Sequence, residues 1–222
     1  MAASSGVILA VKPTLIIMVK QPSPGRVKTR LARDIGHIAA AAWYRRQCRA
    51  LIRRLSRDPR WQVVLAVSPD HQGMVSRVWP AALPRMAQGP GDIGARMARL
   101  LAAAPRPALL IGSDIPGITQ AHIARAIRAL GGHDMVFGPA EDGGFWLFGI
   151  NKSARTRSPF RNVRWSGPHA MQDVWSNLPD HASIGLLPML TDIDDLGDWR
   201  AWSRRKGPWR PPAIHRKRLQ GH

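Results

Sequence analysis

The most informative stretch of this sequence is KQPSPGRVKTRL, at Lys20–Leu31. It follows an apolar run, Leu15–Val19, that has the length and residue types of a buried strand. The two prolines and the glycine predict a loop, and a helix is expected to start within Lys28–Arg33. A glycine lets the backbone approach a ligand closely, and a helix N-terminus offers free N–H groups. We therefore expect this strand-to-helix turn to bind phosphate, through Lys20, Gly25, Arg26, Lys28, Thr29 and Arg30.

Apolar, strand-like segments alternate with amphipathic, helix-like segments along the chain. Short buried strands separated by helices are typical of an α/β fold, an open and mostly parallel sheet with helices on both faces. We expect one domain at residues 14–203, an N-terminal extension at 1–13 and a basic, flexible tail at 204–222. The expected strands are 15–19, 62–67, 85–88, 108–112, 135–138 and 145–150, and the expected helices include 35–57, 95–104 and 121–130.

The composition favours an anionic partner. The formal net charge is +19, from 33 Lys and Arg against 14 Asp and Glu, which suits nucleotides, nucleic acid or acidic lipid. However, much of the charge follows the polar side of one amphipathic helix, as on an ordinary solvated face. These residues are Arg45, Arg46, Arg49, Arg53, Arg54 and Arg57.

Cysteine usage and hydropathy indicate a cytoplasmic protein. The single cysteine, Cys48, excludes an internal disulfide framework and a cysteine metal cluster, and its apolar helical neighbours place it in the core. No run approaches the ~20 apolar residues of a membrane span, and Lys12 and Pro13 interrupt the N-terminal apolar run too early for a signal peptide. The oligomeric state is not predicted.

An aspartate follows the expected strand at 108–112. In open α/β sheets ligands bind outside the carboxyl ends of the strands, so Asp114 is a candidate for chemistry. An aspartate at this place can also simply cap the next turn.

A second acidic group lies late in the chain. If Thr191–Asp194 is extended, Asp192 and Asp194 point to the same side, where their repulsion would be relieved by a divalent cation. Alternatively, Asp194 or Asp195 caps the helix that carries two of the tryptophans.

The loop GPAEDGG at Gly138–Gly144 is the third candidate. Gly143 and Gly144 can offer backbone N–H groups to a ligand, and Asp142 can orient or deprotonate a hydroxyl group. The same composition is also that of a tight hairpin turn.

Electrostatics favours a metal ion if these groups converge. A carboxylate about 4 Å from a phosphate charge is opposed by ~4 kcal/mol at an effective dielectric constant near 20. We therefore expect Asp114, Asp192 and Asp194 to hold Mg²⁺, or Mn²⁺, beside the bound phosphates.

The chain resembles a bacterial GT-A-like family of glycosyltransferase-like proteins, part of the nucleotide-diphospho-sugar transferase superfamily. It is more distantly similar to phospholactate guanylyltransferase and molybdenum-cofactor guanylyltransferase. The resemblance spans roughly Leu15 to Trp202, with Phe145-Trp146 standing where tyrosines are common and the tail after Ser203 being additional. The matching segments are KQPSPGRVKTRL, QGPGDIGARM, LLIGSDIPG, GPAEDGGFWLFGI, VRWSG and LPMLTDIDDLGDW.

This resemblance implies a GT-A fold and a metal-dependent transferase acting on a nucleotide or nucleotide-sugar. Lys20, Gly25, Lys28 and Arg30 match the family's basic loop, and Asp114 matches its strand-end aspartate. Asp192 and Asp194 match the late acidic pair that helps hold metal and phosphorylated substrate in the guanylyltransferase relatives.

Three functions are compared. The first is glycosyl transfer from a nucleotide-diphospho-sugar, with Asp114 and Asp142 as the catalytic residues. The second is nucleotidyl transfer, in which an NTP and a small phosphorylated acid are joined with release of pyrophosphate. The third, and least favoured, is a non-catalytic protein that binds nucleic acid through its basic surface.

Overall fold

A computed structural model describes residues 11–151, 158–191, 193 and 195–206. The expected extension and tail lie mainly outside these ranges, so the domain boundaries stay a prediction. The described elements, in chain order, are β1 (Thr14–Lys20), α1 (Thr29–Ile35), α2 (His37–Leu55), β2 (Gln62–Ser68), α3 (Asp70–Val75), β3 (Arg85–Ala87), α4 (Ile93–Ala103), β4 (Ala108–Ile111), α5 (Gln120–Leu130), β5 (Met135–Pro139), β6 (Phe145–Ile150), α6 (Ala170–Ser176), β7 (Ile184–Leu186) and α7 (Leu196–Lys206).

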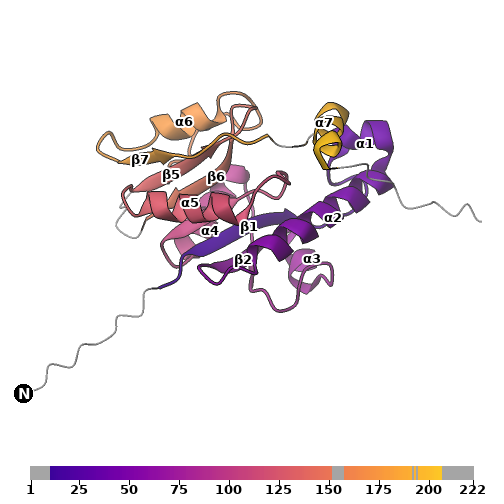
Figure 1. The fold of residues 1–222 in the computed structure, drawn as a ribbon, viewed down its shortest axis with the longest axis horizontal. Helices are drawn as coiled ribbons and strands as arrows, with labels where there is room; N and C mark the ends of the chain where they lie inside the picture. Colours follow the sequence, from indigo (N-terminus) through magenta and orange to yellow (C-terminus); the bar gives the residue numbers. More distant parts are fainter. Residues whose placement is uncertain (1–10, 152–157, 192, 194, 207–222) are drawn as a thin grey trace, which may run out of the picture.

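The described strands form a single sheet in the order β3-β2-β1-β4-β6-β5-β7 (Figure 1). Strand β6 is antiparallel to its neighbours β4 and β5, whereas all the other pairs are parallel. At the centre of the sheet Ile17 of β1 pairs with Leu65 of β2 and with Ile111 of β4. The predicted open, mostly parallel sheet is confirmed.

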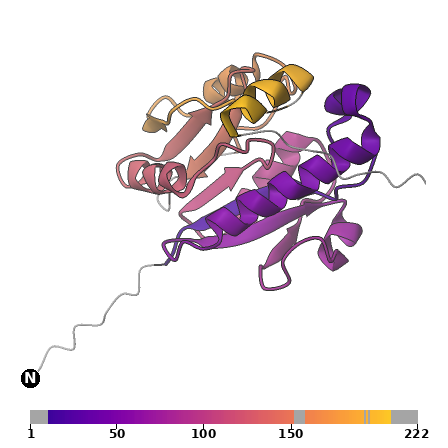
Figure 2. The ribbon, with the colours of Figure 1, turned by 45° about the vertical axis from the view of Figure 1, so that its right-hand side comes forward.

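Helices cover both faces of this sheet. Residues that alternate along β1 point to opposite faces, and they belong to two different core clusters. Leu15 and Ile17 belong to a core cluster with α2 and α5, and the tryptophans of α7 pack against the same cluster. Ile16 belongs to the other cluster, with Leu100 of α4 and Val174 of α6. Figures 1 and 2 show α2 and α5 lying along the same side of the sheet.

The predicted helix at 35–57 is present as α2, which begins at His37, directly after the separate short helix α1. The backbone of Gly36 has φ 85° and separates α1 from α2, a conformation that glycine adopts without a steric penalty. After this break α2 runs back along the sheet, whereas α1 stays near the end of β1 (Figure 1). Within the described part of the chain, no helix has both the length and the apolar character required to cross a membrane.

Candidate functional site

Two loops leave the carboxyl edge of the sheet side by side. Strands β1 and β4 are parallel neighbours, so the loop after Lys20 and the loop after Ile111 emerge at the same place. The first loop contains two tight turns, closed by hydrogen bonds from Ser23 N to Gln21 O (2.8 Å) and from Arg26 N to Ser23 O (3.1 Å). Gly25 lies within it at φ 76°. The predicted strand-to-helix turn is therefore present at this edge.

Lys28 links the two loops. Its backbone is left-handed, with φ 46° and ψ 49°, a conformation that costs free energy for a residue with a side chain. Its side chain is only 5% exposed, and its Nζ lies 3.3 Å from Oδ1 of Asp114, whose side chain is 50% exposed. The strained turn therefore directs an ammonium group to the carboxylate that follows β4.

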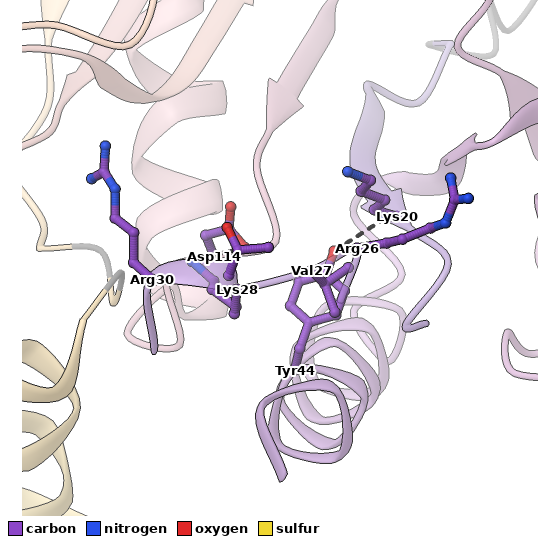
Figure 3. A pocket seen from close by; sticks show the side chains of 8 residues that line it. Lys20, Arg26, Val27, Lys28, Arg30, Tyr44 and Asp114 are labelled. Carbon is purple, nitrogen blue, oxygen red and sulfur yellow. Dashed lines mark hydrogen bonds and ion pairs between the residues drawn. The ribbon is translucent and has the colours of Figure 1, made fainter. Parts of the chain in front are cut away.

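The basic loop and the aspartate enclose one pocket of about 310 Å³. Figure 3 shows Lys28 and Asp114 at its centre, with Arg30 on one side and Lys20 and Arg26 on the other. Gly25 is not among its lining residues, so its predicted role in phosphate binding stays a prediction. The lining residues are Lys20, Arg26, Val27, Lys28, Thr29, Arg30, Tyr44 and Asp114.

A second pocket, of about 360 Å³, also includes Asp114. Asp142 and Gly144 line it, together with the aromatic side chains of Trp146 and Trp165. Half of the residues that line the first pocket are cationic, whereas the second is lined mostly by apolar and aromatic groups. Asp114 is thus the residue that the two pockets share.

The loop carrying Asp142 is also the hairpin turn that the sequence left open as an alternative. Strands β5 and β6 are antiparallel, and Asp142 Oδ1 accepts a hydrogen bond from Gly144 N at 2.9 Å. Gly143 has φ 83°, which this turn requires. The hairpin alternative is confirmed, and the N–H groups of Gly143 and Gly144 are used within it, since Gly143 N also donates to Ala140 O at 3.2 Å. Asp142 and Gly144 border the second pocket, and the ligand-binding role of this loop stays a prediction.

Tyr44 is a site residue that the sequence analysis missed. Its hydroxyl accepts a hydrogen bond from Lys20 N at 3.1 Å and shares another with Ser113 Oγ at 2.9 Å. One buried side chain of α2 therefore ties the end of β1 to the residue before Asp114. The available signal was weak: Tyr44 is the only tyrosine in the sequence, but it stands on the apolar side of a helix.

The late acidic pair, Asp192 and Asp194, lies outside the described residues. Asp195 accepts a hydrogen bond from Asp198 N at 3.0 Å at the start of α7, so the capping alternative is confirmed for Asp195. In the part of the chain that the structure describes, no three His, Cys, Asp or Glu side chains come together as a metal-binding group. The predicted three-aspartate site therefore stays a prediction.

Cys48 lies in the core beneath Tyr44, as predicted. Burial raises the pKa of its thiol from 9.0 to about 12. Because the unfolded state loses this proton at a lower pH, the thiol favours folding below pH 9 and that contribution is lost as the pH rises toward 12. We expect the free energy of unfolding to fall between pH 9 and pH 11.

Urea unfolding at several pH values checks this expectation. In Cys48→Ala the free energy of unfolding should fall less steeply above pH 9 than in the wild type, although Tyr44, whose pKa burial also raises, keeps part of the slope. Equal slopes for the two proteins would show that the thiol does not contribute.

The model of a family described as "Uncharacterized protein conserved in bacteria (DUF2064)" matches residues 51–167 of the 222. No curated protein matches the chain.

Solved structures share the fold. A candidate nucleotide-diphospho-sugar transferase from Desulfovibrio desulfuricans G20 is 25% identical, with a TM-score of 0.79 over 89% of this chain and 88% of that one. A 4-diphosphocytidyl-2C-methyl-D-erythritol synthase from Anaerococcus prevotii is 8% identical, with a TM-score of 0.61 over 89% and 99%. Rv0371c from Mycobacterium tuberculosis H37Rv, in complex with manganese, is 13% identical, with a TM-score of 0.51 over 86% and 97%.

Proposed function

Since the chain belongs to the bacterial DUF2064 family, we propose a function for this member of the family: a transferase that acts on a nucleotide-activated substrate, most simply by glycosyl transfer from a nucleotide-diphospho-sugar. The observation that carries this proposal is the position of Asp114 between two pockets. The cationic pocket fits a diphosphate, and the aromatic pocket beside it leaves room for the group transferred and its acceptor. The Desulfovibrio protein, similar along most of its length, supports the same class of substrate.

The basic loop would bind the diphosphate. Arg26, Arg30 and Lys20 surround the pocket from several sides, and guanidinium groups form paired, charge-assisted hydrogen bonds with phosphate oxygens. The ammonium group of Lys28 lies beside Asp114. From there it can stabilise the negative charge that develops on the departing nucleotide. Catalysis requires that this stabilisation be stronger in the transition state than in the bound ground state.

The transfer itself needs a base on the acceptor side. The bond between the anomeric carbon and the β-phosphate oxygen breaks, and its electron pair leaves with the nucleoside diphosphate. A hydroxyl oxygen of the acceptor bonds to that carbon, and its proton passes to a carboxylate. We assign this role to Asp142, which is exposed at the border of the second pocket and fixed by its hydrogen bond to Gly144.

Asp114 offers carboxylate oxygens, the kind of ligand that Mg²⁺ and Mn²⁺ prefer. Asp114 presents a half-exposed carboxylate at the junction of the pockets, and such ions take oxygen ligands from one or two carboxylates and from substrate phosphates. Asp114, with Asp192 and Asp194 by their place in the sequence, would hold the ion. When bound, it would supply positive charge against the diphosphate.

Nucleotidyl transfer is the second candidate, favoured by the synthase from Anaerococcus prevotii that shares the fold. In that reaction an oxygen of the second substrate bonds to the α-phosphorus of an NTP and pyrophosphate leaves. The cationic pocket would then hold the triphosphate.

A ligand screen separates the candidates. The full chain is melted with nucleoside triphosphates, diphosphates and nucleotide-diphospho-sugars, each with Mg²⁺ or with EDTA. At 100 times Kd, a bound ligand raises the Tm by roughly 5–10 °C. A shift with nucleotide-sugars and release of nucleoside diphosphate support glycosyl transfer, whereas a shift with NTPs and release of pyrophosphate support the second candidate. No shift with any nucleotide would overturn both.

A further inference from the structure

The outer face of α2 carries a row of arginines that the proposed reaction does not use. Arg45, Arg49 and Arg53 are exposed and four residues apart, so they lie in line along the helix. The sequence of α2 contains no aspartate or glutamate. In the described ranges these three side chains form no ion pair, because the ion pairs of the structure involve other arginines and lysines.

These arginines border two hollows rather than a plain convex surface. The first, of about 560 Å³, lies along α2 and reaches Pro80, and the second, of about 820 Å³, extends under the segment that follows α3. Both include Arg49 and Pro80, so the two hollows adjoin and are together called the groove, and no acidic residue lines either of them. Figure 2 shows α2 exposed along the front of the molecule, with the α3 segment beneath it.

The far wall of the groove is also basic and is held in a fixed shape. Arg85 donates hydrogen bonds to Met74 O at 2.7 Å and to Trp79 O at 3.1 Å, which fixes the segment between α3 and β3. Arg77, on that segment, is exposed and lines the second hollow. Like charges gathered in this way repel one another, and an anionic ligand would relieve the repulsion.

Exposed apolar side chains flank the arginines. Ile38 stands on the same face of α2, seven residues before Arg45, and is 71% exposed. On the other side, Val75 and Met74 of α3 line the second hollow and are 69% and 44% exposed. A face that combines basic and apolar groups is typical of proteins that lie on an anionic membrane.

The groove is less well suited to single-stranded nucleic acid. Binding of that kind uses exposed aromatic rings on which bases stack. The aromatic residue of this groove, Trp79, is buried, with 2% exposure. The apolar groups that are exposed are aliphatic, and they suit the boundary between headgroups and acyl chains.

We propose that this arginine face, made of Arg45, Arg49, Arg53 and Arg77 with Ile38, Met74 and Val75, binds the surface of an anionic phospholipid bilayer. The arginines contact headgroup phosphates within the groove, and the aliphatic side chains enter the acyl boundary. This binding is peripheral and is independent of the nucleotide pocket.

Vesicle sedimentation tests the proposal with the full chain. We expect the wild type to pellet with vesicles of 70% phosphatidylcholine and 30% phosphatidylglycerol and to remain in the supernatant with pure phosphatidylcholine. Each arginine near an anionic surface strengthens binding about fivefold, so the triple variant Arg45→Gln, Arg49→Gln, Arg53→Gln should bind about 100-fold more weakly. Val75→Ser should weaken binding in a way that added salt does not mask, because its contribution is apolar.

A matched variant separates the face from net charge alone. Arg125, Arg128 and Arg161 are exposed elsewhere, and changing all three to Gln removes the same charge but should alter vesicle binding less than threefold. All variants keep residues 204–222, so an unchanged triple variant on α2 would overturn the proposal. Tighter binding to an RNA oligonucleotide than to the anionic vesicles, lost in that same variant, would also overturn it in favour of nucleic acid.

Discussion

Replacing Asp114 by asparagine is expected to lower turnover roughly 10²–10³-fold, because the divalent ion that it would hold supplies positive charge against the departing diphosphate, and loss of one such stabilising group costs about this much. The carboxylate is half exposed, and its Oδ1 lies 3.3 Å from Nζ of Lys28. Asparagine preserves the shape but not the charge, so it can neither balance Lys28 nor bind a divalent cation well. The initial rate of nucleoside diphosphate release, with the donor that stabilises the wild type, measures the effect.

The structure supplies a control for this substitution. Asp180 is exposed in the loop before β7, away from both pockets, and Asp180→Asn should retain full turnover. Asp114→Asn should also lose the difference in Tm between Mg²⁺ and EDTA that nucleotide binding produces. If Asp114→Asn keeps its rate within threefold of the wild type, Asp114 has no catalytic role and the shared position between the pockets is incidental.

The sequence predicted those elements of the fold whose own residues carry a strong pattern. Strands β1, β2 and β4 are apolar over most of their length because both of their faces are buried. Three elements were missed: α3 with six residues, α6 with seven and β7 with three. Helices this short are not stable by themselves. Tertiary contacts stabilise α3. Gly73 packs directly on Val67, and the Arg85 side chain donates hydrogen bonds to the carbonyl groups of Gly73 and Met74 in the last turn of the helix.

The site was predictable only where it depends on position along a strand. Lys28 and Asp114 each follow a strand, and parallel strands bring their carboxyl ends to one edge, so their proximity could be expected. The bond between Tyr44 and Ser113 joins residues 69 positions apart, and nothing local in the sequence indicates it. The left-handed backbone of Lys28 could not be expected either, since it is imposed by the path of the loop.

Replacing Gly143 by alanine is expected to destabilise the protein by about 3 kcal/mol. The residue has φ 83°, where a side chain is strained, and a Cβ atom would lie 2.3 Å from the carbonyl oxygen and 2.5 Å from the Cα of Pro168. Backbone atoms cannot rotate away as a side chain can, so the turn must shift, adding to a backbone cost of order 1–3 kcal/mol. The carbonyl of Gly143 also accepts a hydrogen bond from Met171 N at 3.0 Å, which would weaken.

Thermal and urea unfolding of Gly143→Ala should therefore show a Tm lower by roughly 6–12 °C. Gly167→Ala is the matched control: Gly167 lines the second pocket, which the turn of Gly143 borders, yet no heavy atom lies within 4 Å of its added Cβ and its φ is not in the left-handed region. It should change the free energy of unfolding by less than about 0.5 kcal/mol. A normal Tm for Gly143→Ala would mean that the turn moves freely away from Pro168. Asp142 would then not be held at a fixed place beside the second pocket, and its role as the base would lose its structural support.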